Sequence, residues 1–200
     1  MNTTYGVKDS QLSGKAEPII IIKNKLKKGT FGDVNEELSR DLSVPIPSTE
    51  IKQHIAYIKS IIPSAIACGS YRREKLLSSD MDVIVLEPIK IVFEKLSKNN
   101  YIRGIFNKGA KRMICVVKIN DKPYRQLDII YATKEELPFA KLYFTGPKKF
   151  NIKMRILAKK MGLKLNQYGL YKGAKKIPNL KTEKDIFKAL KKEYLEPKHR

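Results

Sequence analysis

The sequence predicts an α+β fold in which helices pack on a mixed β-sheet and a smaller α/β region follows. Three observations support this prediction. An amphipathic helical pattern follows Pro45, apolar runs typical of strands occur between residues 64 and 131, and residues 138–200 alternate between helical and hairpin patterns. With 42% hydrophobic residues in a chain of 200, the sequence can bury a core in one or two small domains.

The first 44 residues are polar and rich in lysine, and they predict an N-terminal extension. The apolar run Ile19–Ile22 indicates some β structure, and Gly29–Asp33 indicates a turn. A domain is predicted to begin at Pro45. There Ser48 is placed as the N-cap of a helix whose apolar residues recur at helical spacing, at Ile51, Ile55, Ile58 and Ile62.

The next segment predicts the order strand, glycine turn, helix, strand. The first strand is expected at Ser64–Cys68, the turn at Gly69 and Ser70, and the helical stretch at Tyr71–Leu77. A second strand follows Ser78 and stops at Pro88, because proline cannot donate to a strand ladder.

Two further strands are predicted, at Met113–Ile119 and Gln126–Tyr131. The residues Asp121–Pro123 between them favour a turn, so the two strands are expected to pair as a hairpin. We assign residues 45–137 to this first domain and residues 138–200 to a second, basic one.

The second domain predicts two helices and a hairpin. A helix is expected over Lys148–Gly162, with Gly162 ending it, and a hairpin is expected to turn near Gly173. Thr182 and Asp185 have the spacing of a capping box, which predicts that a last helix begins there and continues to residue 194.

The charge of the chain is strongly positive. There are 41 Lys and Arg against 20 Asp and Glu, a formal net charge of +21, and residues 141–200 hold 18 basic but only 4 acidic side chains. Such an excess attracts polyanions, so the sequence favours nucleic-acid binding through the second domain. A solvated basic surface or a membrane-surface protein is the alternative.

Membrane and secretory features are not expected. The longest apolar runs, such as Ile19–Ile22 and Met81–Leu86, are far shorter than the ~20 residues of a membrane span. The beginning of the sequence has neither a signal pattern nor an Arg-rich amphipathic one, which predicts an intracellular, reducing compartment. Cys68 and Cys115 are expected to be buried thiols, with a disulfide between them as the alternative.

Three acidic residues are candidates for metal ligands. Asp80 and Asp82 are alternate residues at the start of a strand, so their side chains should project on one face. Asp128 is an acid within another apolar strand, where an unpaired charge would be costly. If the strands are neighbours, the three carboxylates can hold two Mg²⁺ or Mn²⁺ ions. The alternatives are an exposed strand face for the pair and an ion pair between Asp128 and Arg125 or a lysine.

The stretch Gly69–Glu74, GSYRRE, lies eleven residues before the first of these acids. Backbone amides at a glycine turn and a helix N-terminus can bind phosphate, and Arg72 and Arg73 lie close behind. Alone, a Gly-Ser pair before a helix is more often an ordinary turn and N-cap. Its combination with the acidic strand favours a phosphate site.

These residues resemble the family X DNA polymerases. The motifs of that family occur here in order: GS-x-R-R from Gly69, D-x-D from Asp80, the further Asp128, YFTG at Tyr143–Gly146, FN-x-x-MR at Phe150–Arg155, N-x-Y at Asn166–Tyr168, and EKDIF and YLEPKHR near the end. The resemblance covers residues 45–200. It implies a nucleotidyltransferase-type palm followed by a small DNA- and nucleotide-binding subdomain.

The resemblance also implies roles for individual residues. Asp80, Asp82 and Asp128 would be catalytic and would bind two Mg²⁺ ions per site, with Mn²⁺ able to substitute. The incoming dNTP would be bound by Gly69, Ser70, Arg73, Ser79, Tyr143, Phe144, Gly146 and Asn151. DNA would be contacted by Arg125, Gln126, Lys148, Arg155 and Lys159. Packing in the core is the alternative for at least one ring of Tyr143 and Phe144, and the Gly146-Pro147 bond is open to either cis or trans.

Some residues depart from the family pattern. Gln126 stands where most relatives have an arginine near the primer phosphate, Ile152 replaces a base-stacking lysine, and Lys148 replaces an acid beside the incoming base. These changes bear on base-pair discrimination. The lyase domain of larger relatives is not recognisable in residues 1–44, so no deoxyribose-phosphate lyase activity is expected.

The function implied is a DNA-directed DNA polymerase that adds dNTPs to a primer 3′-hydroxyl, filling short gaps in base excision repair, with low fidelity. The expected partners are gapped or primer-template DNA and dNTP, the protein acts as a monomer, and it has no membrane partner. Two alternatives stay open. One is a template-independent nucleotidyltransferase, and the other is a non-catalytic basic module that binds nucleic acid.

Overall fold

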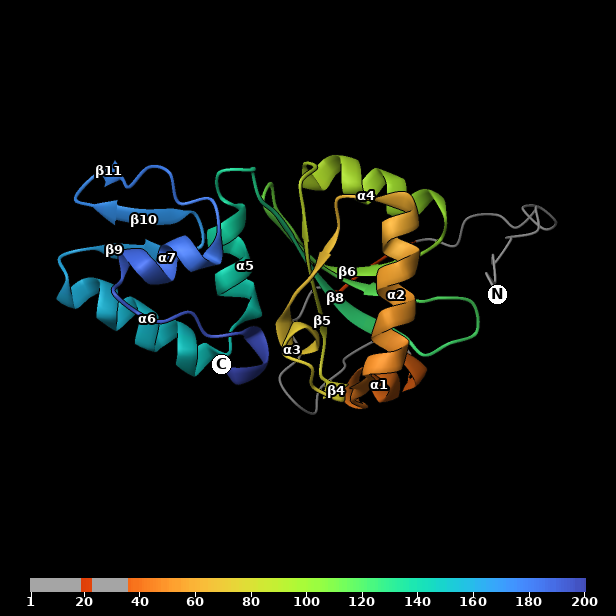
Figure 1. Cartoon of the computed structure of the whole chain (residues 1–200). Helices are drawn as coiled ribbons and strands as arrows, with labels where there is room; N and C mark the ends of the chain where they lie inside the picture. Colours follow the sequence, from red (N-terminus) through yellow and green to blue (C-terminus); the bar gives the residue numbers. More distant parts are fainter. Residues whose placement is uncertain (1–18, 23–35) are drawn as a thin grey trace, which may run out of the picture.

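The computed structural model describes residues 19–22 and 36–200, and it confirms an α+β fold (Figure 1). The elements, in chain order, are β1 (Ile20–Ile21), α1 (Glu36–Ser43), β2 (Ile46–Pro47), α2 (Ser48–Ile61), β3 (Ile66–Ala67), α3 (Gly69–Arg72), β4 (Leu77–Ser78), β5 (Met81–Val85), α4 (Ile89–Lys98), β6 (Ile102–Lys108), β7 (Arg112–Val117), β8 (Arg125–Tyr131), α5 (Leu137–Thr145), α6 (Lys148–Lys160), β9 (Lys164–Asn166), β10 (Gly169–Lys172), β11 (Lys175–Lys176), α7 (Glu183–Ala189) and the 3-10 helix η1 (Pro197–His199).

A six-stranded mixed sheet with the order β1-β6-β7-β8-β5-β3 forms the centre of the first domain. Strands β7 and β8 pair antiparallel, which confirms the predicted hairpin. Strand β5 lies beside β8 and runs parallel to it, although three elements separate them in sequence. This parallel pair places the two strands that contain the candidate metal ligands next to each other.

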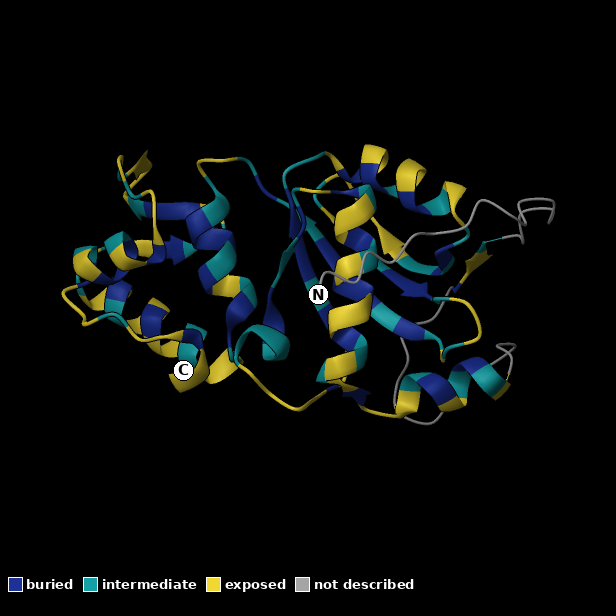
Figure 2. Ribbon diagram, turned by 45° about the vertical axis from the view of Figure 1, so that its right-hand side comes forward, coloured by how far each residue is buried: buried dark blue, intermediate teal, exposed yellow. Residues whose placement is uncertain are grey.

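Helices α2 and α4 cover one face of this sheet. Their apolar residues pack against alternate residues of β7 and β8 in the largest core cluster. Figure 2 shows the result, with buried strands behind helices that expose one stripe to solvent. The acids project from the opposite face, because successive side chains of a strand point to opposite sides. Helices α5 and α1 cover other parts of that face, through Ile84 and Val116.

The N-terminal region contributes one strand and one helix to the described structure. Ile20 and Ile21 pair parallel with Gly104 and Ile105 of β6, so the predicted β structure in this extension is present. Helix α1 was not predicted. It packs through Leu38 in a small cluster with Ile22 and Val116. The predicted turn at Gly29–Asp33 lies outside the described residues.

Three boundary predictions are wrong. Pro47 rather than Ser48 is the N-cap of α2, and Ser48 is its first helical residue. Helix α3 ends at Arg72 instead of continuing to Leu77, since residues 77 and 78 pair with β2 as strand β4. Helix α7 ends at Ala189, five residues before the predicted end.

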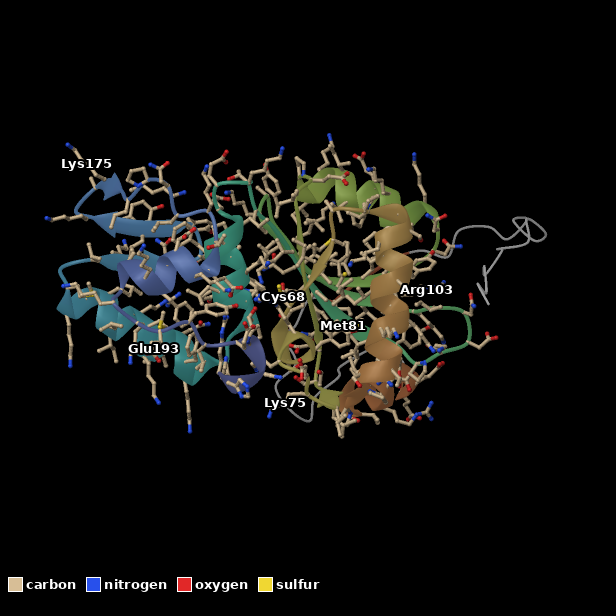
Figure 3. All side chains as sticks on the ribbon, in the orientation of Figure 1. Cys68, Lys75, Met81, Arg103, Lys175 and Glu193 are labelled. Atoms are coloured by element: carbon tan, nitrogen blue, oxygen red, sulfur yellow. The ribbon has the colours of Figure 1, made fainter. Side chains whose placement is uncertain are left out.

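The C-terminal region, residues 138–200, has its own core. Phe139, Leu142, Met154, Ile186 and other apolar residues of α5, α6, α7 and the β9-β10 hairpin form it. Gly162 follows α6 with a φ of 69°, and Gly173 turns between β10 and β11 with a φ of 58°, as predicted. Figure 3 shows Lys175 at the outer tip of that turn.

The capping box predicted at the start of α7 is confirmed. The Thr182 side chain accepts a hydrogen bond from the Asp185 amide, at 3.2 Å, and the Asp185 carboxylate accepts one from the Thr182 amide, at 2.8 Å. Two of the unpaired donors at the helix start are thereby satisfied. The box fixes Glu183 as the first residue of α7, where it faces the first domain.

Glu183 connects the two regions through arginines. Its carboxylate accepts hydrogen bonds from both terminal nitrogens of Arg72, the last residue of α3, and from Nη1 of Arg200 at 2.7 Å. The Arg200 guanidinium also lies over the rings of Phe150 and Phe187. The glycine turn of the first domain is therefore tied to the C-terminal region by a buried ion pair.

Both cysteines are free and buried, as predicted. Burial raises the pKa of the Cys68 thiol to about 12, so it stays protonated. Within the described residues, no helix has the length and apolar character needed to cross a membrane.

Candidate active site

The candidate metal ligands project from the sheet face opposite helices α2 and α4. Asp82 on β5 and Asp128 on β8 are direct partners in the parallel ladder, so their side chains project side by side. Asp80 precedes β5 by one residue and lies two residues from Asp82. The register of β5 and β8 thus brings together the acids that the sequence singled out.

The negative charges of these acids repel one another. Burial, and after it the charges of Asp80 and Asp128, raises the pKa of Asp82 to about 7. Burial also raises the pKa of Asp80, which a hydrogen bond from Ser79 opposes and the charge of Asp128 reinforces. Burial is the main cause of both shifts, and the rest is negative charge that the nearby arginines do not fully offset.

Arg112 compensates part of this negative charge. Its Nε donates to Oδ1 of Asp128 at 2.9 Å and its Nη2 donates to Oδ2, a bidentate pair. The structure thereby gives Asp128 an arginine partner from the neighbouring strand β7, not the Arg125 or lysine weighed from the sequence. In this arrangement no three His, Cys, Asp or Glu side chains among the described residues are clustered closely enough to count as a metal site.

The glycine turn lies directly beside the acids. Gly69 has a φ of 60°, and a Cβ at this position would overlap the Asp82 carboxylate. The Cys68 amide donates to the Asp82 carbonyl at 2.8 Å, which fixes the turn to β5. Ser70 donates its hydroxyl hydrogen to Ser78 Oγ at 2.6 Å. The turn and the acids therefore form one rigid wall.

A cleft of about 910 Å³ opens in front of this wall, between the first domain and the C-terminal region. It is lined by all three candidate catalytic acids and by every candidate nucleotide-binding residue, together with two of the candidate DNA contacts. The predicted residues that line it are Gly69, Ser70, Arg73, Ser79, Asp80, Asp82, Asp128, Tyr143, Phe144, Gly146, Lys148, Asn151 and Arg155.

Aromatic and polar side chains of α5 and α6 form the opposite wall. The rings of Tyr143 and Phe144 meet edge to face, 5.4 Å apart, and the Arg155 guanidinium lies 5.0 Å from the Tyr143 ring centre. Asn151 donates its amide hydrogen to the Tyr143 carbonyl at 2.7 Å. The Gly146-Pro147 bond after α5 is cis.

Known proteins with a similar sequence decide the family. A model of the DNA polymerase beta thumb matches residues 140–200. The repair DNA polymerase X of African swine fever virus (strain Badajoz 1971 Vero-adapted) is 35% identical over 148 residues, which cover 72% of this chain and 84% of the viral protein. The chain belongs to the family X DNA polymerases. The resemblance inferred from the ordered motifs is thereby confirmed.

Solved structures agree with this family X assignment. A ternary gap complex of Leishmania infantum polymerase beta matches with a TM-score of 0.74 and 25% identity, covering 85% of this chain and 77% of that one. A ternary P/T complex of the same polymerase matches with a TM-score of 0.72 and 25% identity, covering 85% and 84%. This family X enzyme is a nucleotidyltransferase, a DNA polymerase with a function in repair whose partner is DNA.

Family X polymerases depend on metal ions. The donor chemistry of the three acids fits such ions, although with Arg112 on Asp128 the described residues form no ready cluster of three ligands. Three carboxylates offer the hard oxygen donors that Mg²⁺ and Mn²⁺ prefer. Two of them have raised pKa values because burial and mutual repulsion are not fully compensated. The deficit of positive charge beside the phosphate-binding turn is what a divalent cation would remove.

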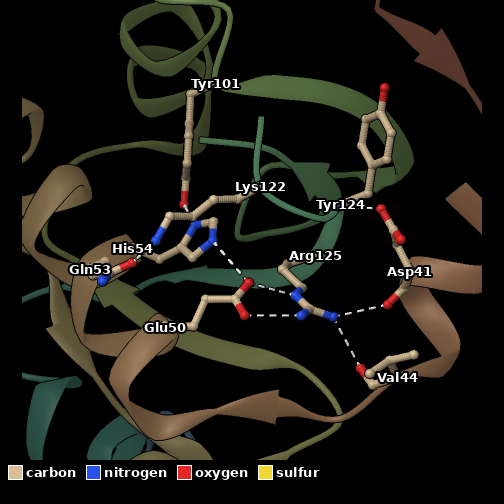
Figure 4. A network of polar contacts seen from close by, with 9 residues as sticks. All are labelled: Asp41, Val44, Glu50, Gln53, His54, Tyr101, Lys122, Tyr124 and Arg125. Atoms are coloured by element: carbon tan, nitrogen blue, oxygen red, sulfur yellow. Dashed lines mark hydrogen bonds and ion pairs between the residues drawn. The ribbon is translucent and has the colours of Figure 1, made fainter. Parts of the chain in front are cut away.

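Three predicted DNA contacts of the polymerase lie outside the cleft. Arg125 is only 4% exposed, and its guanidinium is held by the Glu50 carboxylate and by the carbonyls of Asp41 and Val44 (Figure 4). A buried arginine with these partners cannot bind DNA, so its prediction is corrected to a structural role. Gln126 is half-buried on β8 opposite Val116, and Lys159 is exposed on α6.

Sequence reasoning missed several residues of the cleft. Lys111, Arg112, Ile130, Tyr131 and Gln167 line it but were not singled out. Arg112 gave no signal because its contact with Asp128 depends on the register of β7 against β8. Ile130 could have been found, since strand alternation places it on the same face as Asp128. Lys111 lies 5.1 Å from the ring centre of Tyr168 and is paired with Glu136.

Proposed function

We propose that this family X polymerase fills short gaps during base excision repair, adding a dNTP to a primer 3′-hydroxyl as the template directs. The observation that supports it is the position of Asp80, Asp82 and Asp128 beside the Gly69 turn, on one wall of a cleft whose other wall is aromatic and polar. A nucleotide can be bound there by its triphosphate on one side and by its sugar and base on the other.

In this proposal the turn and its arginine hold the triphosphate. Gly69 and Ser70 are the first two residues of helix α3 and line the cleft, so their backbone amides would donate hydrogen bonds to phosphate oxygens. Arg73 lies in the same cleft and donates from Nη1 to the Thr145 carbonyl, which orients its guanidinium beside Gly146. Ser79 and Ser70 add hydroxyl groups at the same edge.

In this proposal the acids would hold two Mg²⁺ ions, for which Mn²⁺ could substitute. When bound, such ions neutralise the phosphate and lower the barrier to attack by the primer oxygen. In this proposal Asp80 and Asp82 would ligate both ions, and Asp128 would help to activate the primer 3′-hydroxyl. Tyr143, Phe144 and Asn151 contact the sugar and the base edge of the dNTP.

We further propose low fidelity and a monomeric enzyme. Lys148 and Ile152 line the cleft at the start of α6, where the nascent base pair is expected. Ile152 is 46% exposed and offers apolar contact without a donor or acceptor, so it can hold different base pairs equally well. Discrimination then depends on polar neighbours such as Asn151 and Arg155.

Extension of a primer across a one-nucleotide gap, with Mg²⁺ and each dNTP in turn, tests the proposal. The wild type should add the base complementary to each of four template bases. Asp82→Asn should lower extension by at least about a hundredfold, because a ligand of the metal ions that stabilise the developing charge is lost, while DNA affinity measured without divalent ions stays within a factor of two. The matched control is Asp121→Asn, an exposed acid in the β7-β8 turn.

The outcomes separate the alternatives. Addition that ignores the template base would replace the proposal with a template-independent nucleotidyltransferase. Binding of gapped DNA with no extension by the wild type would leave only a nucleic-acid-binding module. Full activity in Asp82→Asn would place the active site elsewhere.

A further inference from the structure

Arg112 and Asp128 form an ion pair inside the cleft. The arginine begins β7, the acid lies on β8, and two hydrogen bonds join the guanidinium to both carboxylate oxygens. The Asp128 side chain is 8% exposed, whereas that of Arg112 is 56% exposed. The Arg112 guanidinium can therefore move away from Asp128 into solvent, whereas the buried Asp128 carboxylate stays in place.

The pair stands where a divalent cation is expected. A guanidinium that engages both oxygens of a carboxylate occupies the edge that would face a metal ion, and two cations on one carboxylate repel each other. Arg112 and a divalent ion therefore compete for Asp128.

Lys111, the preceding residue, is not part of this competition. Its ammonium contacts both carboxylate oxygens of Glu136, at 2.7 and 2.8 Å. Lys111 and Arg112 carry the same charge, are adjacent in the chain and line the same cleft, yet only Arg112 touches a candidate metal ligand. This difference provides a matched comparison.

We propose that Arg112 is a positioning residue that couples DNA binding to metal binding. Without DNA it holds Asp128, and a phosphate of the bound DNA strand then takes the guanidinium and frees the carboxylate for the cation. The planar fork of an arginine suits a phosphate as well as a carboxylate, so the exchange replaces one bidentate partner with another. The inference depends on the metal site of the proposed function.

Coupling of this kind is reciprocal. If DNA removes a competitor of the metal ion, DNA tightens metal binding, and the metal ion tightens DNA binding by the same factor. Removal of Arg112 abolishes this part of the coupling in both directions. Attraction between the metal ion and the DNA phosphates remains in every variant, so the informative quantity is the difference between variants.

Binding of Mn²⁺, measured from the free-ion signal in electron paramagnetic resonance, tests the proposal without turnover. Wild type, Arg112→Gln and Lys111→Gln are titrated with Mn²⁺ alone and with a one-nucleotide-gapped duplex whose primer ends in a dideoxynucleotide. A sample of DNA without protein supplies the blank, and no dNTP is added. Arg112 is exposed, so the glutamine variant should fold, which a thermal melt verifies.

Arg112→Gln should bind Mn²⁺ about fivefold more tightly than the wild type in the absence of DNA, as loss of an ion pair worth ~1 kcal/mol implies. DNA should tighten Mn²⁺ binding clearly more in the wild type than in this variant. Lys111→Gln should behave as the wild type in both titrations. The proposal would be overturned if Arg112→Gln and Lys111→Gln tightened Mn²⁺ binding equally in the absence of DNA, because loss of positive charge alone would then explain the effect. It would also be overturned if Arg112→Gln did not tighten Mn²⁺ binding.

Asp82→Asn separates this inference from the proposed function. If wild-type Mn²⁺ binding disappears in Asp82→Asn but is unchanged in Arg112→Gln, the metal site stands and only the role of Arg112 is wrong. If the wild type shows no Mn²⁺ binding that depends on Asp82, the metal site itself is wrong and the inference falls with it.

Discussion

Gly69 lies so close to the Asp82 carboxylate that a Cβ at position 69 would overlap its Oδ2. The glycine also has a φ of 60°, a conformation that side chains disfavour. One position thus meets two separate demands, one from the backbone and one from the acid.

Gly69→Ala should therefore lower activity far more than its backbone strain explains. We expect gap filling to fall by at least about a hundredfold, because Asp82 must move from its place. The control is Gly173→Ala, which has a φ of 58° and no atom within 4 Å of the added Cβ. Both variants should lose about 1–2 kcal/mol of stability from positive φ. Equal activities in a gap-filling assay would contradict the prediction.

Glu183→Gln should weaken the connection between the two regions. Glu183 is buried and binds Arg72 and Arg200, so the neutral amide would leave two cations poorly compensated. The expected cost is about 3 kcal/mol in urea unfolding. The KM for dNTP should rise as well, because Arg72 ends the helix that presents the phosphate site. Glu193→Gln, an exposed acid of the same region labelled in Figure 3, should change neither quantity.

His54 predicts a pH dependence of stability (Figure 4). Its side chain is fully buried, with Nδ1 2.8 Å from the Tyr101 hydroxyl, and burial lowers its pKa from 6.5 to about 4. The unfolded chain binds a proton below about pH 6.5 and the folded chain resists it, so stability is complete above pH 6.5 and declines as pH falls toward 4. The decline amounts to about 3 kcal/mol.

The measurement is the free energy of unfolding in urea from pH 7.5 to 4, compared between wild type and His54→Asn. The asparagine keeps a polar group near Tyr101 but has no proton to gain. The difference in unfolding free energy between the two proteins should shrink as pH falls, because only the wild type loses the His54 contribution. Other titrating groups are common to both proteins and cancel. A constant difference across the range would show that His54 does not titrate as predicted.

Lys159 should contribute to DNA affinity through charge alone. It is exposed on α6, outside the cleft but on the helix that contains Asn151 and Arg155. Lys159→Gln should reduce the slope of log affinity against log salt by about one, for every DNA sequence equally. Lys98→Gln, an exposed lysine of α4 behind the sheet, makes the same charge change and should leave the slope unaltered.

The site was predictable where local sequence and strand alternation determine it. Asp80 and Asp82 share a face because they are alternate residues, and the apolar residues that follow them place both acids at the beginning of strand β5. Alternation also shows why Arg125 was placed wrongly. It lies three residues before Asp128 on the same strand, so its side chain points to the opposite face, where Glu50 pairs with it.

Other features depended on distant parts of the chain. Helix α3 is short because Leu77 and Ser78 pair with β2, a contact that outweighs the helical tendency of residues 71–77. Helices α1, α4 and α5 and strand β6 were not predicted either. For α4 the signal was present in the sequence, because its buried residues Ile89, Val92 and Leu96 recur at helical spacing. The role of Arg112 required the register of two strands, which composition does not reveal.

The parallel pairing of β5 with β8 has a consequence for the order of events during folding. The chain between these strands includes α4, β6 and β7, so Asp82 and Asp128 meet only after that whole intervening segment has been arranged. Contacts between distant segments form slowly because loop closure costs entropy first. Incompletely folded chains therefore keep Asp82 and Asp128 apart, so the proposed metal site would form only in molecules whose sheet is complete.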